Sequence, residues 1–198
     1  RRPRRDRNAR RNHLLQGPMN SDGIAVPRDR IQSRFVSTAD VIFGNTVAET
    51  SVIGTGVGSI TLPAHFFKPG SILNVSLGGF YNSGASPADL RFRLKLNGTL
   101  IHDVVADLVA SMEEGALKLE FNVLCRAAAI NGTLVTDGDV RWEKLDGSWD
   151  NQIAPFLGNT VNTTIAQTLS VTAQYDSAQL DDAFDAVRFD LQRLPRPL

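Results

Sequence analysis

The side chains that could do chemistry are few, and most of them lie far apart in the sequence. The densest group is acidic and lies near the C-terminal end. A calcium ion takes roughly six to eight oxygen ligands, and the spacing of these aspartates matches no known calcium-binding loop. We therefore predict solvated strand ends or subunit salt bridges here, and no metal site. The group consists of Asp176, Asp181, Asp182, Asp185 and Asp190.

No nucleophile, base or metal-ligand arrangement is apparent elsewhere. No serine lies in a Gly-x-Ser-x-Gly turn, and Glu113, Glu114 and Asp137 fit solvated loop acids better than a glycosidase pair. The single cysteine, Cys125, rules out an intrachain disulfide and lies in an apolar run typical of a buried strand. We predict no catalytic residue, no metal, no cofactor and no enzymatic activity. The histidines have no zinc-site spacing; they are His13, His65 and His102.

Three aromatic residues, Trp142, Trp149 and Phe156, frame the segment Glu143–Pro155, which we interpret as a loop. Exposed aromatic side chains in such a loop could stack on a sugar or fill a subunit interface, because aromatic residues are enriched at interfaces and pair an apolar body with a polar tip. We favour the interface and keep ligand binding as the alternative.

The strongest signal is the distribution of charge. The net charge of the chain is zero, but residues 1–34 carry ten arginines against three aspartates, and residues 35–198 carry the compensating excess of acids. Arginine binds phosphate in a bidentate manner, so the arm could bind nucleic acid with a strong salt dependence. It could equally lie over the acidic surface of a neighbouring subunit. The arginines that we expect to make either contact are Arg1, Arg2, Arg4, Arg5, Arg7, Arg10 and Arg11.

The rest of the chain reads as short alternating runs separated by Gly, Pro and Asn, which is the pattern of antiparallel strands with one buried face. Two Asn-Gly pairs, at Asn97-Gly98 and Asn131-Gly132, predict hairpins with type I′ turns. Only residues 103–115 could form a short helix. The strands are expected at 40–43, 47–53, 59–62, 71–81, 89–96, 99–105, 116–128, 133–144, 166–175 and 183–191.

This pattern of strands and turns predicts an all-β antiparallel β-sandwich or jelly roll at residues 35–198, preceded by an extended basic N-terminal arm and linker at residues 1–34. The arm has too little apolar content to pack a core of its own. No apolar run reaches the roughly 18 residues of a membrane span, so we expect no membrane partner.

The body resembles β-rich, jelly-roll-like virion proteins of phages and other viruses. The resemblance covers residues 46–176 and is carried by the segments 46–64, 67–73, 78–81, 94–99 and 165–175. It implies a jelly-roll subunit of a capsid decoration, fibre or knob that forms homotrimers in the virion and has no catalytic residues.

The arm resembles the basic arms of small icosahedral capsid proteins. We therefore expect a capsid-attached subunit that contacts other virion proteins through the arm. Two alternatives stay open. One is a shell-forming capsid protein whose arm binds the genome, and the other is a carbohydrate- or receptor-binding module.

Overall fold

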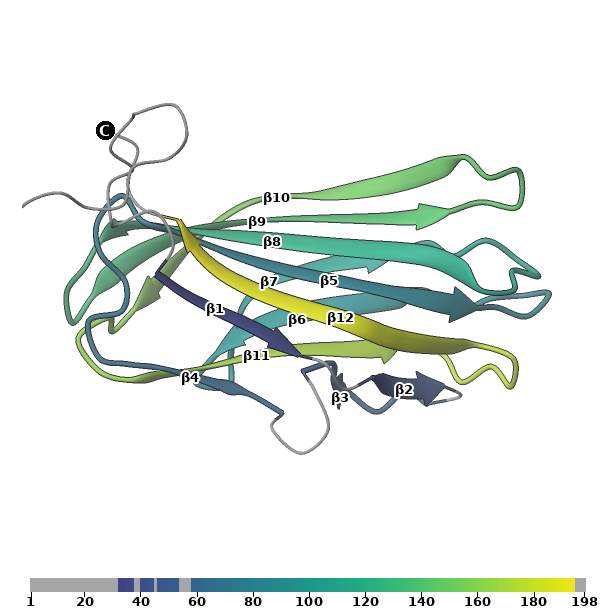
Figure 1. Ribbon diagram of the computed structural model, residues 1–198, viewed down its shortest axis with the longest axis horizontal. Coiled ribbons are helices and arrows are strands. Elements are labelled where there is room, and N and C mark those ends of the chain that lie inside the picture. The colour runs from purple at the N-terminus through teal and green to yellow at the C-terminus, as the bar shows by residue number, and fades with distance from the viewer. Residues whose placement is uncertain (1–31, 38–39, 45, 54–57, 195–198) are drawn as a thin grey trace, which may run out of the picture.

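Alternating sequence segments form strands throughout the body. The computed structural model describes residues 32–37, 40–44, 46–53 and 58–194, and the seven arm arginines at 1–11 lie outside this part of the chain. The described residues contain twelve strands, and none of them is in a helix (Figure 1). The strands are β1 (Gln32–Ser37), β2 (Val41–Gly44), β3 (Thr50–Ser51), β4 (Ile60–Leu62), β5 (Ile72–Asn82), β6 (Leu90–Leu96), β7 (Thr99–Ala106), β8 (Gly115–Ala127), β9 (Gly132–Glu143), β10 (Trp149–Val161), β11 (Gln167–Tyr175) and β12 (Ala183–Leu194).

The strands form two antiparallel sheets that pack face to face. The larger sheet has seven strands in the order β1-β12-β5-β8-β9-β10, and β2 also pairs with β12. The smaller has five strands in the order β3-β11-β6-β7, and β4 also pairs with β11. The fold is therefore the predicted jelly-roll-like β-sandwich. Among the described residues, no helix is long and apolar enough to cross a membrane.

Strict alternation places the apolar side chains between the sheets. In β6 every second residue is buried, and β11 follows the same pattern. Aromatic rings fill the centre, where Phe184 packs edge-on against Phe92 with the ring centroids 5.5 Å apart. Cys125 is fully buried, as expected. Each such buried side chain contributes about 1.5–3 kcal/mol of hydrophobic stabilisation, so this core supports the fold.

The two predicted hairpins differ in their turns. Asn97 and Gly98 have φ angles of 49° and 76°, as a type I′ turn requires, and they join β6 to β7. The second hairpin joins β8 to β9 as predicted, but its connection is the four residues 128–131, and Gly132 is not in the left-handed region. The Gly132 amide instead donates a hydrogen bond to the Ala129 carbonyl. The type I′ prediction is therefore wrong for Asn131-Gly132.

Four other sequence-based interpretations differ from the structure. The segment Glu143–Pro155 is not a loop, because a short turn at residues 144–148 leads into the 13-residue strand β10. Residues 103–115 contain no helix, since β7 continues to Ala106 and a loop follows. The first strand begins at Gln32, so β1 starts inside the expected linker and pairs with β12. The expected strand at 47–53 is reduced to Thr50–Ser51.

Candidate functional site

The edge strand β10 exposes apolar side chains that the fold of one chain leaves uncovered. Ile153, Phe156 and Leu157 are 69%, 74% and 40% exposed, and we call these three residues the β10 ridge. Asp150 is the only charged residue in this strand. Edge strands are normally protected by several charges or by being short. The protection here is limited to Asp150, Pro155 and the register shift between Ala154 and Leu157.

The three aromatic residues singled out in the sequence separate into two environments. Trp142 lies on the inner face of β9 and is 3% exposed, so its expected exposure is wrong and it belongs to the core. Trp149 is 45% exposed, and the Lys118 ammonium lies 4.9 Å from its ring centroid. Phe156 belongs to the β10 ridge. Trp149 and Phe156 are thus available for contact, and Trp142 is not.

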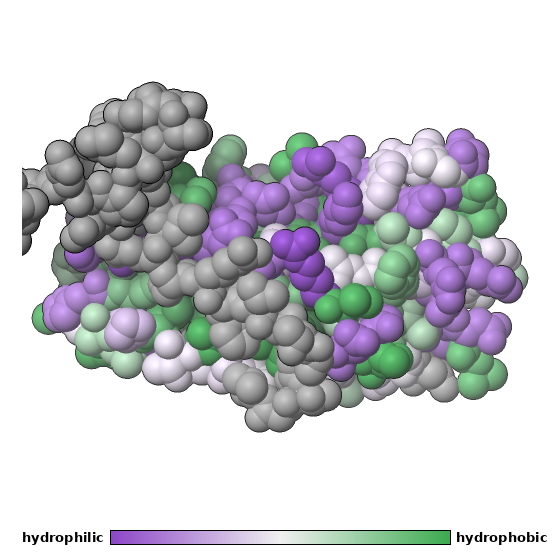
Figure 2. All heavy atoms as spheres, viewed as in Figure 1, coloured by the Kyte–Doolittle hydropathy of each residue, from purple (hydrophilic) through white to green (hydrophobic). Residues whose placement is uncertain are grey.

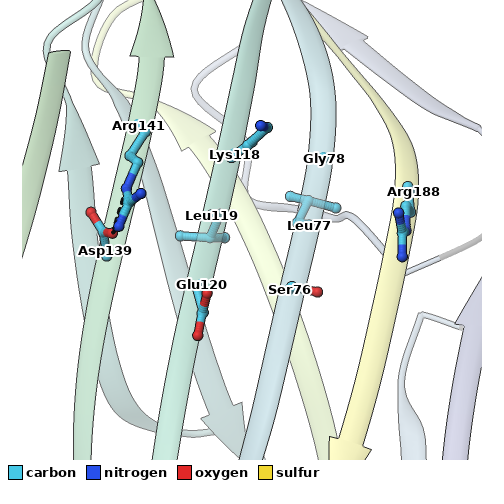
Figure 3. A pocket seen from close by; sticks show the side chains of 9 residues that line it. All are labelled: Ser76, Leu77, Gly78, Lys118, Leu119, Glu120, Asp139, Arg141 and Arg188. Atoms are coloured by element: carbon cyan, nitrogen blue, oxygen red, sulfur yellow. Dashed lines mark hydrogen bonds and ion pairs between the residues drawn. The ribbon is translucent and has the colours of Figure 1, made fainter. Parts of the chain in front are cut away.

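A row of cations crosses the outer face of the larger sheet. Strand pairing places Arg188 opposite Gly78, Gly78 opposite Lys118, and Lys118 opposite Arg141. Because Gly78 has no side chain, the row is interrupted and a hollow of about 340 Å³ opens over β5 and β8 (Figure 3). Figure 2 shows clusters of hydrophilic residues among apolar ones on this face. We call this feature the charged hollow; it is lined by Ser76, Leu77, Gly78, Lys118, Leu119, Glu120, Asp139, Arg141 and Arg188.

A row of acceptors runs beside the cations. Asp190 pairs in register with Ser76, Ser76 with Glu120, and Glu120 with Asp139. Arg141 donates two hydrogen bonds to Asp139, and this bonding raises the pKa of the Arg141 guanidinium. The charged hollow therefore presents alternating donors and acceptors. Asp190, at the end of this row, forms an ion pair with Arg188, with an N···O distance of 2.5 Å.

The charged hollow was not anticipated, because its residues come from four strands, of which only β8 and β9 are consecutive in sequence. Only the pairing register brings them together. The outward alternation of each strand was a usable signal, but it does not reveal which strand lies beside which.

The acidic cluster near the C-terminus supports a loop. Asp182 is 1% exposed, and its carboxylate accepts hydrogen bonds from the amides of Gly84 at 3.0 Å and Ala88 at 2.7 Å. It thereby ties the β11–β12 connection to the β5–β6 connection. In the part of the chain that the structure describes, no three His, Cys, Asp or Glu side chains are grouped to hold a metal ion.

The two ends of the sandwich differ in charge. The loops 83–89, 107–114, 144–148 and 176–182 lie together at one end (Figure 1) and carry eight acidic residues against the single base Lys144. The loops 63–71, 97–98, 128–131 and 162–166 lie at the other end, and within these four loops Lys68 is the only Lys, Arg, Asp or Glu. The strand β1, which follows the basic arm in sequence, begins at this second end.

A buried histidine lies between the two sheets. His102 is fully buried, its Nδ1 is 3.0 Å from the Thr136 hydroxyl, and its ring packs edge-on against Phe121. Gly138 makes room for the ring, since a Cβ there would lie 2.8 Å from His102 Cδ2. Within the described residues, His102 Nε2 has no hydrogen-bond partner. Burial lowers the pKa of His102 below its usual 6.5, although Asp103 and Asp137 partly oppose the shift.

This geometry predicts an acid-labile fold. Neutral His102 is favoured in the folded state, so its stabilisation is present above pH 6.5 and is lost as the pH falls below that value. One extra proton bound on unfolding makes the free energy of unfolding fall by up to about 1.4 kcal/mol per pH unit. Urea unfolding of wild type and His102→Gln between pH 7 and about pH 5 tests this. The wild type should lose stability more steeply, and the exposed-residue variant His65→Gln should behave like wild type. Parallel curves for His102→Gln and wild type would refute the assignment.

Comparisons with known proteins support no assignment by sequence. No family model matches the chain. No curated protein matches it either.

Several solved structures are similar in outline. Arcelin-5, a lectin-like defence protein from Phaseolus vulgaris, is 7% identical over 81% of this chain and 97% of its own, with a TM-score of 0.39. A seed lectin isoform from Lotus tetragonolobus is 9% identical over 83% of this chain and 100% of its own, with a TM-score of 0.39. The CBM2 module of the evolved Dit of Lactobacillus casei BL23 phage J-1 is 10% identical over 71% of this chain and 69% of its own, with a TM-score of 0.35. At these TM-scores the similarity carries no argument about function.

Proposed function

We propose that this protein is a structural subunit of a virion, a β-sandwich head that assembles as a homotrimer and attaches to a capsid or fibre base through residues 1–34. The observation that carries this proposal is the β10 ridge. Three large apolar side chains lie exposed on a strand with a single charged residue. Exposed apolar side chains on an edge strand with so little charge are characteristic of an interface between proteins.

The geometry of β10 favours contact through side chains. The ladder between β9 and β10 is interrupted between Ala154 and Leu157, and Pro155 has no amide hydrogen to donate. A second β10 therefore cannot extend the sheet along the whole strand. Ile153 pairs with Asp139 on the outer face of β9 and Leu157 pairs with Thr136 on its inner face, so a contact along this edge must cover both faces. Packing of three β10 edges around a common axis can do so without a continuous ladder, and this is consistent with a trimer.

The charge difference between the two ends suggests how the arm attaches. The acidic loops of one subunit can receive the arginines of a neighbouring chain. An exposed ion pair contributes only about 0–1 kcal/mol, so several arginines must act together. Because the acidic end supplies a protein partner for the arm, we favour attachment to protein. Binding of the genome by a shell-forming capsid protein is the alternative.

The arm is tested in the full-length chain by replacing all seven arginines at 1–11 with glutamine. If the arm attaches to protein, the variant keeps the oligomeric mass of the wild type but no longer binds virus particles that lack this protein. The wild type should also purify without nuclease-sensitive material. Wild-type binding to generic DNA or RNA at micromolar levels, weakening steeply with salt and lost in the variant, would instead establish the capsid alternative.

A further inference from the structure

We propose that the charged hollow binds a sugar that carries one anionic group, either a carboxylate or a sulfate. This inference concerns a site on the outer face of the larger sheet and is independent of the trimer and the arm. It rests on the two rows of side chains, on the gap at Gly78 and on the position of Trp149.

The gap in the basic row is suited to a single anion. Arg188 and Lys118 flank Gly78 on the two neighbouring strands, and adjacent strands lie about 4.8 Å apart. The two cations are therefore positioned on either side of a space that no side chain fills. The Arg188 side chain is 66% exposed, so its guanidinium can bind a ligand while it remains paired with Asp190. A carboxylate or sulfate between them receives charge-assisted hydrogen bonds.

The acceptor row favours hydroxyl groups in the rest of the ligand. Glu120 and Asp139 lie next to the cations in register, and Asn74 donates a 2.6 Å hydrogen bond to Glu120. Carboxylates accept hydrogen bonds from hydroxyl groups but repel further anionic groups. A ligand with hydroxyl groups beside one negative charge can interact favourably with both the cations and the acceptor row. A densely charged polyanion, such as nucleic acid, can interact favourably only with the cations.

Trp149 adds an apolar surface beside the charged hollow, outside the nine residues that line it. It pairs with Glu143 at the start of β10, and its ring lies beside Lys118. An aromatic face packs well against the apolar C–H face of a sugar ring. The volume of about 340 Å³ lies at the lower end of the range of ligand pockets, which matches one or two sugar residues.

The binding test compares three trisaccharide- or disaccharide-sized probes by titration calorimetry on the full-length chain: sialyllactose, sulfated lactose and lactose. We expect at least one anionic probe to bind about tenfold or more tightly than lactose, the ratio that one charge-assisted hydrogen bond supplies. Sialyllactose binding identifies a carboxylate ligand, and sulfated lactose binding a sulfate ligand. Equal binding of all three probes, or binding of none, would overturn the proposal.

Substitutions in the charged hollow distinguish ligand binding there from ligand binding to the basic arm, because every variant retains the arm. A Cβ at Gly78 would meet only Arg188 Cβ at 4.0 Å, so Gly78→Leu is expected to fold and to abolish probe binding. Gly158→Val is the control for probe binding only, because Gly158 is also a strand glycine of the larger sheet with open space around it but lies next to Leu157 of the β10 ridge; it should leave probe affinity unchanged even if the oligomeric mass changes. Lys118→Gln should weaken the anionic probe about tenfold. Lys95→Gln on the smaller sheet should not weaken it.

Two results with these variants contradict the proposal. Unchanged probe affinity in Gly78→Leu would place the binding elsewhere, most simply on the arm. A changed oligomeric mass of Gly78→Leu would show that the hollow is a contact between subunits. The proposed trimer is judged separately, from the mass of the wild type, so the two proposals fail independently.

Discussion

Gly79→Ala is expected to lower the free energy of unfolding by about 3 kcal/mol or more, because added volume in a packed site forces backbone shifts. A Cβ at this position would lie 2.1 Å from the Asp185 carbonyl oxygen and 3.0 Å from the Phe184 ring. The first contact is with backbone, which can give way only by separating β5 from β12. For a chain of this size the melting temperature should fall by roughly 6–12 °C, at 2–4 °C per kcal/mol.

The neighbouring glycine provides the control. Gly78 lies on the opposite face of β5. A Cβ added there would meet only Arg188 Cβ, at 4.0 Å. Gly78→Ala should leave the free energy of unfolding unchanged or raise it by up to about 1 kcal/mol, since alanine restricts the unfolded chain. Urea unfolding of both variants measures the difference. Equal destabilisation by the two substitutions would show that the packing of β5 against β12 is described wrongly.

The double substitution Ile153→Asp and Phe156→Asp is expected to convert the proposed trimer to monomers at micromolar concentration. Both side chains are exposed in a single chain, so the monomer should keep its stability and its circular dichroism spectrum. At an apolar contact, two unpaired carboxylates each cost several kcal/mol of association free energy, or more than about a hundredfold in affinity. Sedimentation velocity measures the change in mass.

Leu180→Asp is the matched control for this prediction. Leu180 is 86% exposed in the β11–β12 loop, so the same chemical change is made away from β10. Its mass should equal that of the wild type. Dissociation by Leu180→Asp, or none by the double substitution, would move the interface away from the β10 ridge.

The parts of the fold that could be read from the sequence are those where burial on one face enforces alternation. The strands β5, β6, β8, β9 and β11 have this pattern and were expected close to their observed bounds. The strand β10 was not expected, because both of its faces are largely exposed and no alternation is imposed on it. Pro155 and the register shift beside it further resemble a loop in the sequence.

The candidate sites depended on information that a single strand does not contain. Trp142 and Trp149 lie on either side of the same turn, but the pairing of β9 with β10 directs one inward and leaves the other exposed. The charged hollow required the register of β12, β5, β8 and β9, which non-local pairing sets. The opposite charges of arm and body were visible from composition. The concentration of acids at one end became visible only once the loops were placed.

The central claim, that three copies of this chain form the working unit, is tested most directly by the mass of the full-length protein in solution. Light scattering at micromolar concentration, before and after nuclease treatment, should give three times the 21.6 kDa of one chain in both samples. A mass of one chain would contradict the trimer. A larger particle that loses mass on nuclease treatment would contradict it in favour of a genome-binding capsid shell.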